Sequence, residues 1–137
     1  VTADDFLVLQ HAGPRSPHAM PEAGFLPIPK KLLAKGVKDM VRISDARMSG
    51  TAFGTIVLHA APEAAIGGPI GLVRSGDRIQ LSVKNRTLDL LIDASELDKR
   101  RAAMPKAADT SGLRGYDKLF RTTVMQAPDG CDFDFCR

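Results

Sequence analysis

The 137-residue sequence is poor in aromatic side chains, with no tryptophan and a single tyrosine. Aromatic residues make up 5% of the chain, and its 19 basic and 16 acidic residues are interleaved rather than clustered. Proteins that bind nucleic acids need a concentrated basic surface, and those that bind single strands also use aromatic rings for stacking. The sequence therefore predicts no nucleic-acid partner.

Long apolar runs and a cysteine framework are also missing. No apolar run approaches the roughly 20 residues needed to cross a bilayer, so no membrane partner is expected. Cys131 and Cys136 lie five positions apart, which is no disulfide framework and favours a reducing, cytoplasmic location. The start has neither methionine nor the basic-then-apolar order of a secretion signal, and we interpret it as a cut within a longer chain or as a processed end.

What remains is an ordinary globular composition, and the chain length fits a single domain over residues 1–137. Short apolar runs predict strands, and alternation of apolar and polar residues over 79–83 predicts a hairpin with 87–92. Punctuation by proline and glycine predicts the first helix, the capping-box-like pair Asp93 and Glu96 predicts the start of the second, and apolar residues at helical spacing predict the third. The expected strands are 6–9, 39–43, 56–58, 70–73, 79–83 and 87–92, and the expected helices are 30–35, 96–103 and 113–125. These elements predict an α+β fold: a mixed, mostly-β, barrel-like core with two or three peripheral helices.

One stretch, residues 43–55, concentrates polar chemistry between two expected strands. It reads Ile-Ser-Asp-Ala-Arg-Met-Ser-Gly-Thr-Ala-Phe-Gly-Thr, with an acid, a base, several hydroxyls and two glycines. Loops that follow strand ends and contain glycine present backbone N–H groups and short polar side chains to ligands. By itself such a loop is more often a solvated turn, and its surroundings favour a functional role here.

Several motifs occur in one order along the chain, at residues 13–14, 20–22, 39–51, 62–69, 114–116 and 130–135. In this order they resemble the C-terminal domain of the dihydroxy-acid and aldonate dehydratase family. The form Ser-Asp-Ala-Arg-Met-Ser-Gly-Thr over 44–51 resembles the sugar-acid branch, such as the L-arabinonate dehydratases. The run over 13–20 departs from the family's usual Gly-Pro-x-Gly-x-Pro-Gly-Met, which bears on loop geometry and substrate choice.

The resemblance implies a swivelling β-barrel-type domain that forms half of an active site. By position, Glu22 matches a glutamate that ligates Mg²⁺, Ser49 matches the serine proposed as the catalytic base, and Thr51 matches the threonine beside it. The partner would be an N-terminal domain of the same polypeptide, carrying the cysteine ligands of a [2Fe–2S] cluster and the other Mg²⁺ ligands. A homo-oligomeric full-length enzyme and a small sugar-acid or dihydroxy-acid substrate are implied as well.

Dehydration of such an acid removes a weakly acidic proton from C2 and expels hydroxide from C3. A serine is a plausible base only where nearby cations stabilise its alkoxide, so we expect the isolated domain to be inactive. Two alternatives remain open: a stand-alone module that binds a small carboxylate or phosphate, and a purely structural or oligomerisation domain. A serine hydrolase is excluded because Ser49 lacks the Gly-x-Ser-x-Gly elbow.

Other polar residues have competing interpretations. Asp45 and Arg47 either contact the substrate or form an internal ion pair that shapes the loop. His59 follows an apolar run and is expected to be a core or rim histidine rather than a ligand. Cys131 and Cys136 are expected to be plain thiols, since two cysteines cannot supply the usual ligands of an iron–sulfur cluster.

Overall fold

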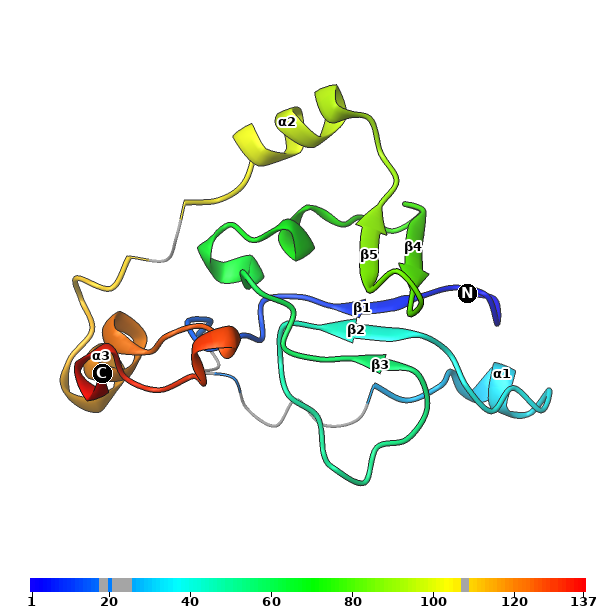
Figure 1. Ribbon diagram of the computed structural model, residues 1–137, viewed down its shortest axis with the longest axis horizontal. Coiled ribbons are helices and arrows are strands. Elements are labelled where there is room, and N and C mark those ends of the chain that lie inside the picture. The colour runs from blue at the N-terminus through cyan, green and yellow to red at the C-terminus, as the bar shows by residue number, and fades with distance from the viewer. Residues whose placement is uncertain (18–19, 21–25, 107–108) are drawn as a thin grey trace.

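A computed structural model describes residues 1–17, 20, 26–106 and 109–137. Its centre is a parallel sheet of three short strands, β1 (Leu7–Leu9), β2 (Arg42–Ser44) and β3 (Ile56–Val57), in the order β1-β2-β3 (Figure 1). Val8 pairs with Ile43, which in turn pairs with Val57. The three predicted strands of this region are confirmed, with β2 shifted toward the loop that follows it.

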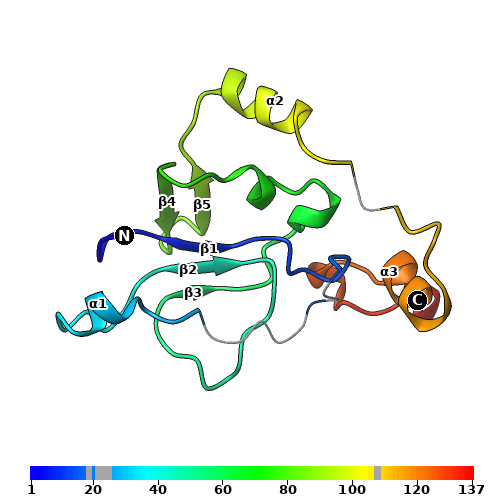
Figure 2. The same ribbon diagram turned by 180° about the vertical axis from the view of Figure 1, so that it is seen from behind.

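A hairpin packs on one face of this sheet. Its strands β4 (Ile79–Ser82) and β5 (Thr87–Leu90) are antiparallel, as the alternating pattern predicted, and they run across the direction of the sheet (Figures 1 and 2). The core between sheet and hairpin centres on Ile43, Ala64 and Ile70, and Val8, Val57 and Ile79 are among the partly buried side chains that pack against it.

The helices lie outside this core. They are α1 (Lys30–Leu33), α2 (Ala94–Ala102) and α3 (Gly115–Thr123), with four 3-10 helices: η1 (Ala64–Ile66), η2 (Pro69–Leu72), η3 (Ala127–Asp129) and η4 (Asp134–Cys136). The strand predicted over residues 70–73 is wrong, because this segment forms η2. Pro69 begins η2, the Gly71 amide donates to the carbonyl of Gly68, and Gly71 packs closely on Ala64.

The fold is thus mixed α and β, with three α-helices and two small sheets in the described part of the chain. These described strands do not close into a barrel, so the barrel-like core is not confirmed. Helices α2 and α3 have nine residues each, and no helix among the described residues has the length and apolar character required to span a membrane.

The loop over residues 45–55 is closed at its base by polar contacts. The Asp39 carboxylate accepts hydrogen bonds from the Thr55 amide at 3.0 Å and the Thr55 hydroxyl at 2.7 Å, and these bonds lower the pKa of that carboxyl. The buried Arg42 guanidinium donates to the Phe53 carbonyl and to Asp39. Gly54, with a φ of +100°, lies inside the clamp that these contacts of Asp39, Arg42, Phe53 and Thr55 form.

Replacing Gly54 by alanine should open the base of this loop. An added Cβ would fall 2.2 Å from Asp39 Oδ1 and 2.5 Å from Arg42 Nη2, and the positive φ adds strain. We expect Gly54→Ala to lower the free energy of unfolding by about 1–3 kcal/mol, measured in urea, and to speed hydrogen exchange at the Thr55 amide. Gly50→Ala is the matched control in the same loop, since an added Cβ there meets no atom within 4 Å. Equal effects of both substitutions would contradict the clamp.

An ion-pair network fixes α2 to the turn before β4. Arg100 of α2 donates to both Asp77 and Glu96, and the Arg100 Nη2 to Asp77 Oδ1 distance is 3.0 Å. The Arg100 hydrogen bonds, aided by the Arg74 amide, lower the pKa of the Asp77 carboxyl. Glu96, predicted to cap the start of this helix, bonds instead with Arg100 one turn further on.

The lowered pKa of Asp77 gives this network a defined pH dependence. Its contribution is fully present above the unfolded-state pKa of 3.8 and is lost as pH falls through the lower folded-state pKa. We expect Asp77→Asn to lower the free energy of unfolding by about 1–2 kcal/mol at pH 7 and to flatten its acid dependence below about pH 4, measured by urea titration. Asp98→Asn, which removes an exposed pair with Arg101, should change stability by less than about 0.5 kcal/mol. An Asp77→Asn protein as stable as the parent at pH 7 would contradict the network's role.

Candidate functional site

Three loops meet at one edge of the parallel sheet. Because β1, β2 and β3 run in the same direction, the segments after residues 9, 44 and 57 emerge together at their carboxyl ends, where open parallel sheets commonly bind ligands. Backbone hydrogen bonds extend the contact beyond the strands: the His59 amide donates to the Ala46 carbonyl at 3.1 Å, and the Ala60 amide donates to the Ser44 carbonyl at 3.0 Å.

Asp45 holds these three loops together through buried hydrogen bonds. Its carboxylate is 1% exposed and follows β2 directly. One oxygen accepts the Ala12 amide at 3.0 Å and the other accepts the Ala64 amide at 2.9 Å. Asp45 therefore shapes the loop through backbone contacts: both of its oxygens are turned inward to N–H groups, and among the described residues it forms no ion pair with Arg47.

A second buried carboxylate, Glu63, joins the C-terminal segment to the same edge. Its Oε1 accepts the Arg15 amide at 2.7 Å and the Gln126 side-chain amide at 2.8 Å, and the Glu63 amide donates back to Gln126 at 3.0 Å. Gly13 packs so closely on Glu63 that an added Cβ would fall 2.2 Å from Oε2. Sequence reasoning missed this residue; the available signal was a single carboxylate next to the small apolar run Ala-Ala-Ile.

The two hydroxyls singled out by sequence lie together at the turn of the middle loop. Ser49 Oγ and Thr51 Oγ1 are 2.8 Å apart, and the Thr51 amide points to Ser49 Oγ at 3.3 Å. The Ala52 amide donates to the Ser49 carbonyl at 2.9 Å and closes the turn. Ser49 is half-buried and Thr51 is exposed, so this pair is open to an incoming molecule. A deprotonated Ser49 would accept hydrogen bonds from both groups of Thr51.

Metal binding does not fit the described residues by themselves. Glu22, the expected Mg²⁺ ligand, lies outside the described residues. Across residues 1–17, 20, 26–106 and 109–137, no group of three or more histidine, cysteine or acidic side chains could hold a metal ion. A metal at this edge would therefore need ligands beyond those that the structure describes.

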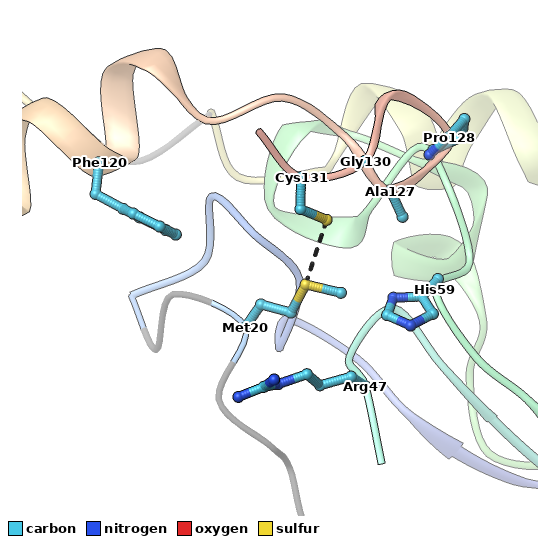
Figure 3. A pocket seen from close by; sticks show the side chains of 8 residues that line it. All are labelled: Met20, Arg47, His59, Phe120, Ala127, Pro128, Gly130 and Cys131. Carbon is cyan, nitrogen blue, oxygen red and sulfur yellow. Dashed lines mark hydrogen bonds between the residues drawn. The ribbon is translucent and has the colours of Figure 1, made fainter. Parts of the chain in front are cut away.

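A pocket of about 700 Å³ opens beside the loop that carries Ser49 and Thr51. Met20, Arg47 and His59 line it, one from each of the three loops, and the opposite wall comes from the C-terminal segment with Phe120, Ala127, Pro128, Gly130 and Cys131 (Figure 3). His59 is exposed, with a left-handed φ of 54°, so it is a rim residue rather than a core one. Sequence reasoning did not predict this pocket.

Cys131 belongs to the wall of this pocket as a neutral thiol. Its Sγ lies 3.5 Å from Met20 Sδ, and Cys131 and Cys136 are both free of disulfides. Burial, with a smaller contribution from the nearby Glu63 carboxylate, raises the pKa of the Cys131 thiol. The thiol therefore stays protonated at neutral pH and adds no negative charge to the pocket.

Comparison with known proteins connects this site to a family. The chain is 53% identical over 135 residues to a 6-deoxy-6-sulfo-D-gluconate dehydratase of Pseudomonas putida, and the match covers 98% of the chain and 23% of that protein. It is 51% identical over 140 residues to an L-arabonate dehydratase of Azospirillum brasilense, at 98% and 24% coverage. An L-arabinonate dehydratase of Rhizobium leguminosarum bv. trifolii is 47% identical over 131 residues, at 96% and 22% coverage.

The chain therefore spans about a quarter of the length of the relatives it matches. The family model described as "Dihydroxy-acid/6-phosphogluconate dehydratase C-terminal" matches residues 1–131, which is nearly the whole chain. The chain belongs to the dihydroxy-acid/6-phosphogluconate dehydratase C-terminal family.

Proposed function

We propose that this chain is the C-terminal part of a hydro-lyase that dehydrates a 2,3-dihydroxy acid or an aldonate to a 2-keto-3-deoxy acid. The observation that carries the proposal is the family match over residues 1–131, together with dehydratase relatives near 50% identity. We place the enzyme in the cytoplasm and expect a homo-oligomer whose N-terminal domain faces the three-loop edge.

Ser49 is the residue that we assign as the base for the proton on C2. Its Oγ takes that proton, the hydroxyl on C3 leaves with the electrons of its bond as a double bond forms, and the enol then tautomerises to the ketone. Thr51 supports this role because its hydroxyl oxygen lies 2.8 Å and its amide nitrogen 3.3 Å from Ser49 Oγ. Both groups can donate to an anionic Ser49 oxygen. Asp45 positions the loop through its two backbone contacts.

The cofactors of the proposed enzyme would be Mg²⁺ and a [2Fe–2S] cluster held by the rest of the polypeptide. Glu22 is the one residue of this chain that we assign to the Mg²⁺. Among the described residues, no lysine, arginine or histidine donates a hydrogen bond to Ser49 Oγ, so in this chain alone Ser49 has the surroundings of an ordinary serine.

We predict that Ser49→Ala in the full-length protein lowers kcat by at least about a hundredfold, because it removes the proposed base. The visible absorbance of the cluster should be unchanged, since the variant leaves cluster ligands untouched. The assay follows formation of the 2-keto-3-deoxy acid from L-arabinonate and D-gluconate. Ser95→Ala, at an exposed position on α2, is the control and should keep full activity. Turnover that survives Ser49→Ala would mean that another group is the base.

We also predict that the 137-residue chain by itself is colourless and does not dehydrate either acid. The same assay, run with and without added Mg²⁺, checks this, and calorimetry should show only weak Mg²⁺ binding. The reason is that the described residues supply neither a metal site nor a basic side chain that donates a hydrogen bond to Ser49 Oγ. Robust turnover by this chain alone would overturn the half-site proposal.

A further inference from the structure

The pocket beside the hydroxyl loop has two polar side chains whose hydrogen-bonding groups are unused. The Arg47 guanidinium and the His59 imidazole make no hydrogen bond or ion pair with any residue that the structure describes, and both residues are exposed. They come from different loops and point in different directions around Met20 (Figure 3). Unpaired donors in a concave site are available to a ligand.

The remaining walls are apolar or neutral. Met20, Phe120, Ala127 and Pro128 supply carbon and sulfur surface, and Cys131 is a protonated thiol. No acidic side chain lines the pocket among the described residues. A ligand that combines C–H surface with hydrogen-bond acceptors therefore matches these walls, while a hydrocarbon chain would leave Arg47 and His59 without partners.

One residue that lines the pocket, Arg47, belongs to the same loop as the proposed base. Arg47 precedes Ser49 by two positions, and two residues of backbone span at most about 7 Å. The carbon chain of a five- or six-carbon acid covers a similar length. An acid whose C2 lies at Ser49 is therefore long enough to reach Arg47 with its far end.

We propose that this pocket binds the part of the substrate beyond C3, and that Arg47 and His59 select acids whose distal carbons carry hydroxyl groups. The inference rests on the proposed dehydratase function and deepens it. The preferred substrates are sugar acids of five or six carbons rather than dihydroxy acids that end in a hydrocarbon group. A chain without distal hydroxyls leaves the Arg47 and His59 side chains without a hydrogen-bond partner on the substrate, which lowers its affinity relative to a sugar acid.

The test compares two substrates in the full-length protein. D-gluconate carries hydroxyls beyond C3, whereas 2,3-dihydroxybutanoate carries only a methyl group there. We expect His59→Leu and Arg47→Met each to raise KM for D-gluconate about tenfold, because each removes a hydrogen bond to a distal hydroxyl. The KM for 2,3-dihydroxybutanoate should change by less than about twofold in either variant, since that substrate makes no such bond.

His11→Leu is the matched control. His11 is exposed, lies outside the pocket and has a φ of 58°, close to the 54° of His59, so the same substitution meets the same backbone strain. This variant should leave both KM values unchanged. Equal rises in KM for the two substrates in His59→Leu or Arg47→Met, or no rise for either, would overturn the assignment of the pocket.

A binding measurement separates this inference from the proposed reaction. If the full-length protein dehydrates neither acid, the reaction proposal fails, and the dissociation constant for D-gluconate is then measured by calorimetry in the parent and in His59→Leu. A rise of about tenfold would support the pocket as a sugar-acid site, and an unchanged constant would overturn it. If Ser49→Ala abolishes turnover while His59→Leu leaves KM for D-gluconate unaltered, the reaction proposal holds and the pocket assignment fails.

Discussion

The arrangement of the site depends on one buried carboxylate. Asp45 bonds the amide of Ala12 with one oxygen and the amide of Ala64 with the other, so it joins the loops after β1, β2 and β3. Burying a carboxylate costs several kcal/mol unless its oxygens are hydrogen-bonded, and bonds to a charged acceptor contribute roughly 1.5–3 kcal/mol each. The cost makes any arrangement that separates these loops unfavourable, because it would leave the carboxylate unpaired.

Glu63 joins the end of the chain to the same edge through one carboxylate oxygen, Oε1. It connects Arg15 and Gln126, which is 63 positions away, and Arg15 in turn donates from Nε to the Val124 carbonyl at 2.9 Å. The pocket wall formed by residues 127–131 is thereby fixed against the loops that carry Arg47 and His59. The shape of the pocket follows from two buried acids acting on backbone and amide groups, together with the contact between the lining residues Cys131 and Met20.

Local patterns predicted the strands well and the site only in part. Alternation of Ile79 and Leu81 with polar residues predicted the hairpin because the period of a half-buried strand is visible in sequence. Residues 70–73 read as a strand, since the packing of Gly71 on Ala64 that favours η2 is a tertiary contact. Asp45 and Glu63 were not predicted as buried anchors, because acids are rarely buried and the backbone amides that donate to their carboxylates lie far along the sequence.

The energetics of Ser49 explain why this chain would need a partner to do chemistry. Lowering the pKa of a hydroxyl from that of water to about 7, as a bound metal does, corresponds to about 12 kcal/mol. In the anion, the hydroxyl and the amide of Thr51 would donate to a charged Ser49 oxygen, and such hydrogen bonds contribute roughly 1.5–3 kcal/mol each. Thr51 can therefore orient Ser49 and favour its anion by at most about 6 kcal/mol, which leaves at least about half of the difference unmet. A serine base at this turn requires positive charge from outside the described residues, which is the role that we assign to the remainder of the polypeptide.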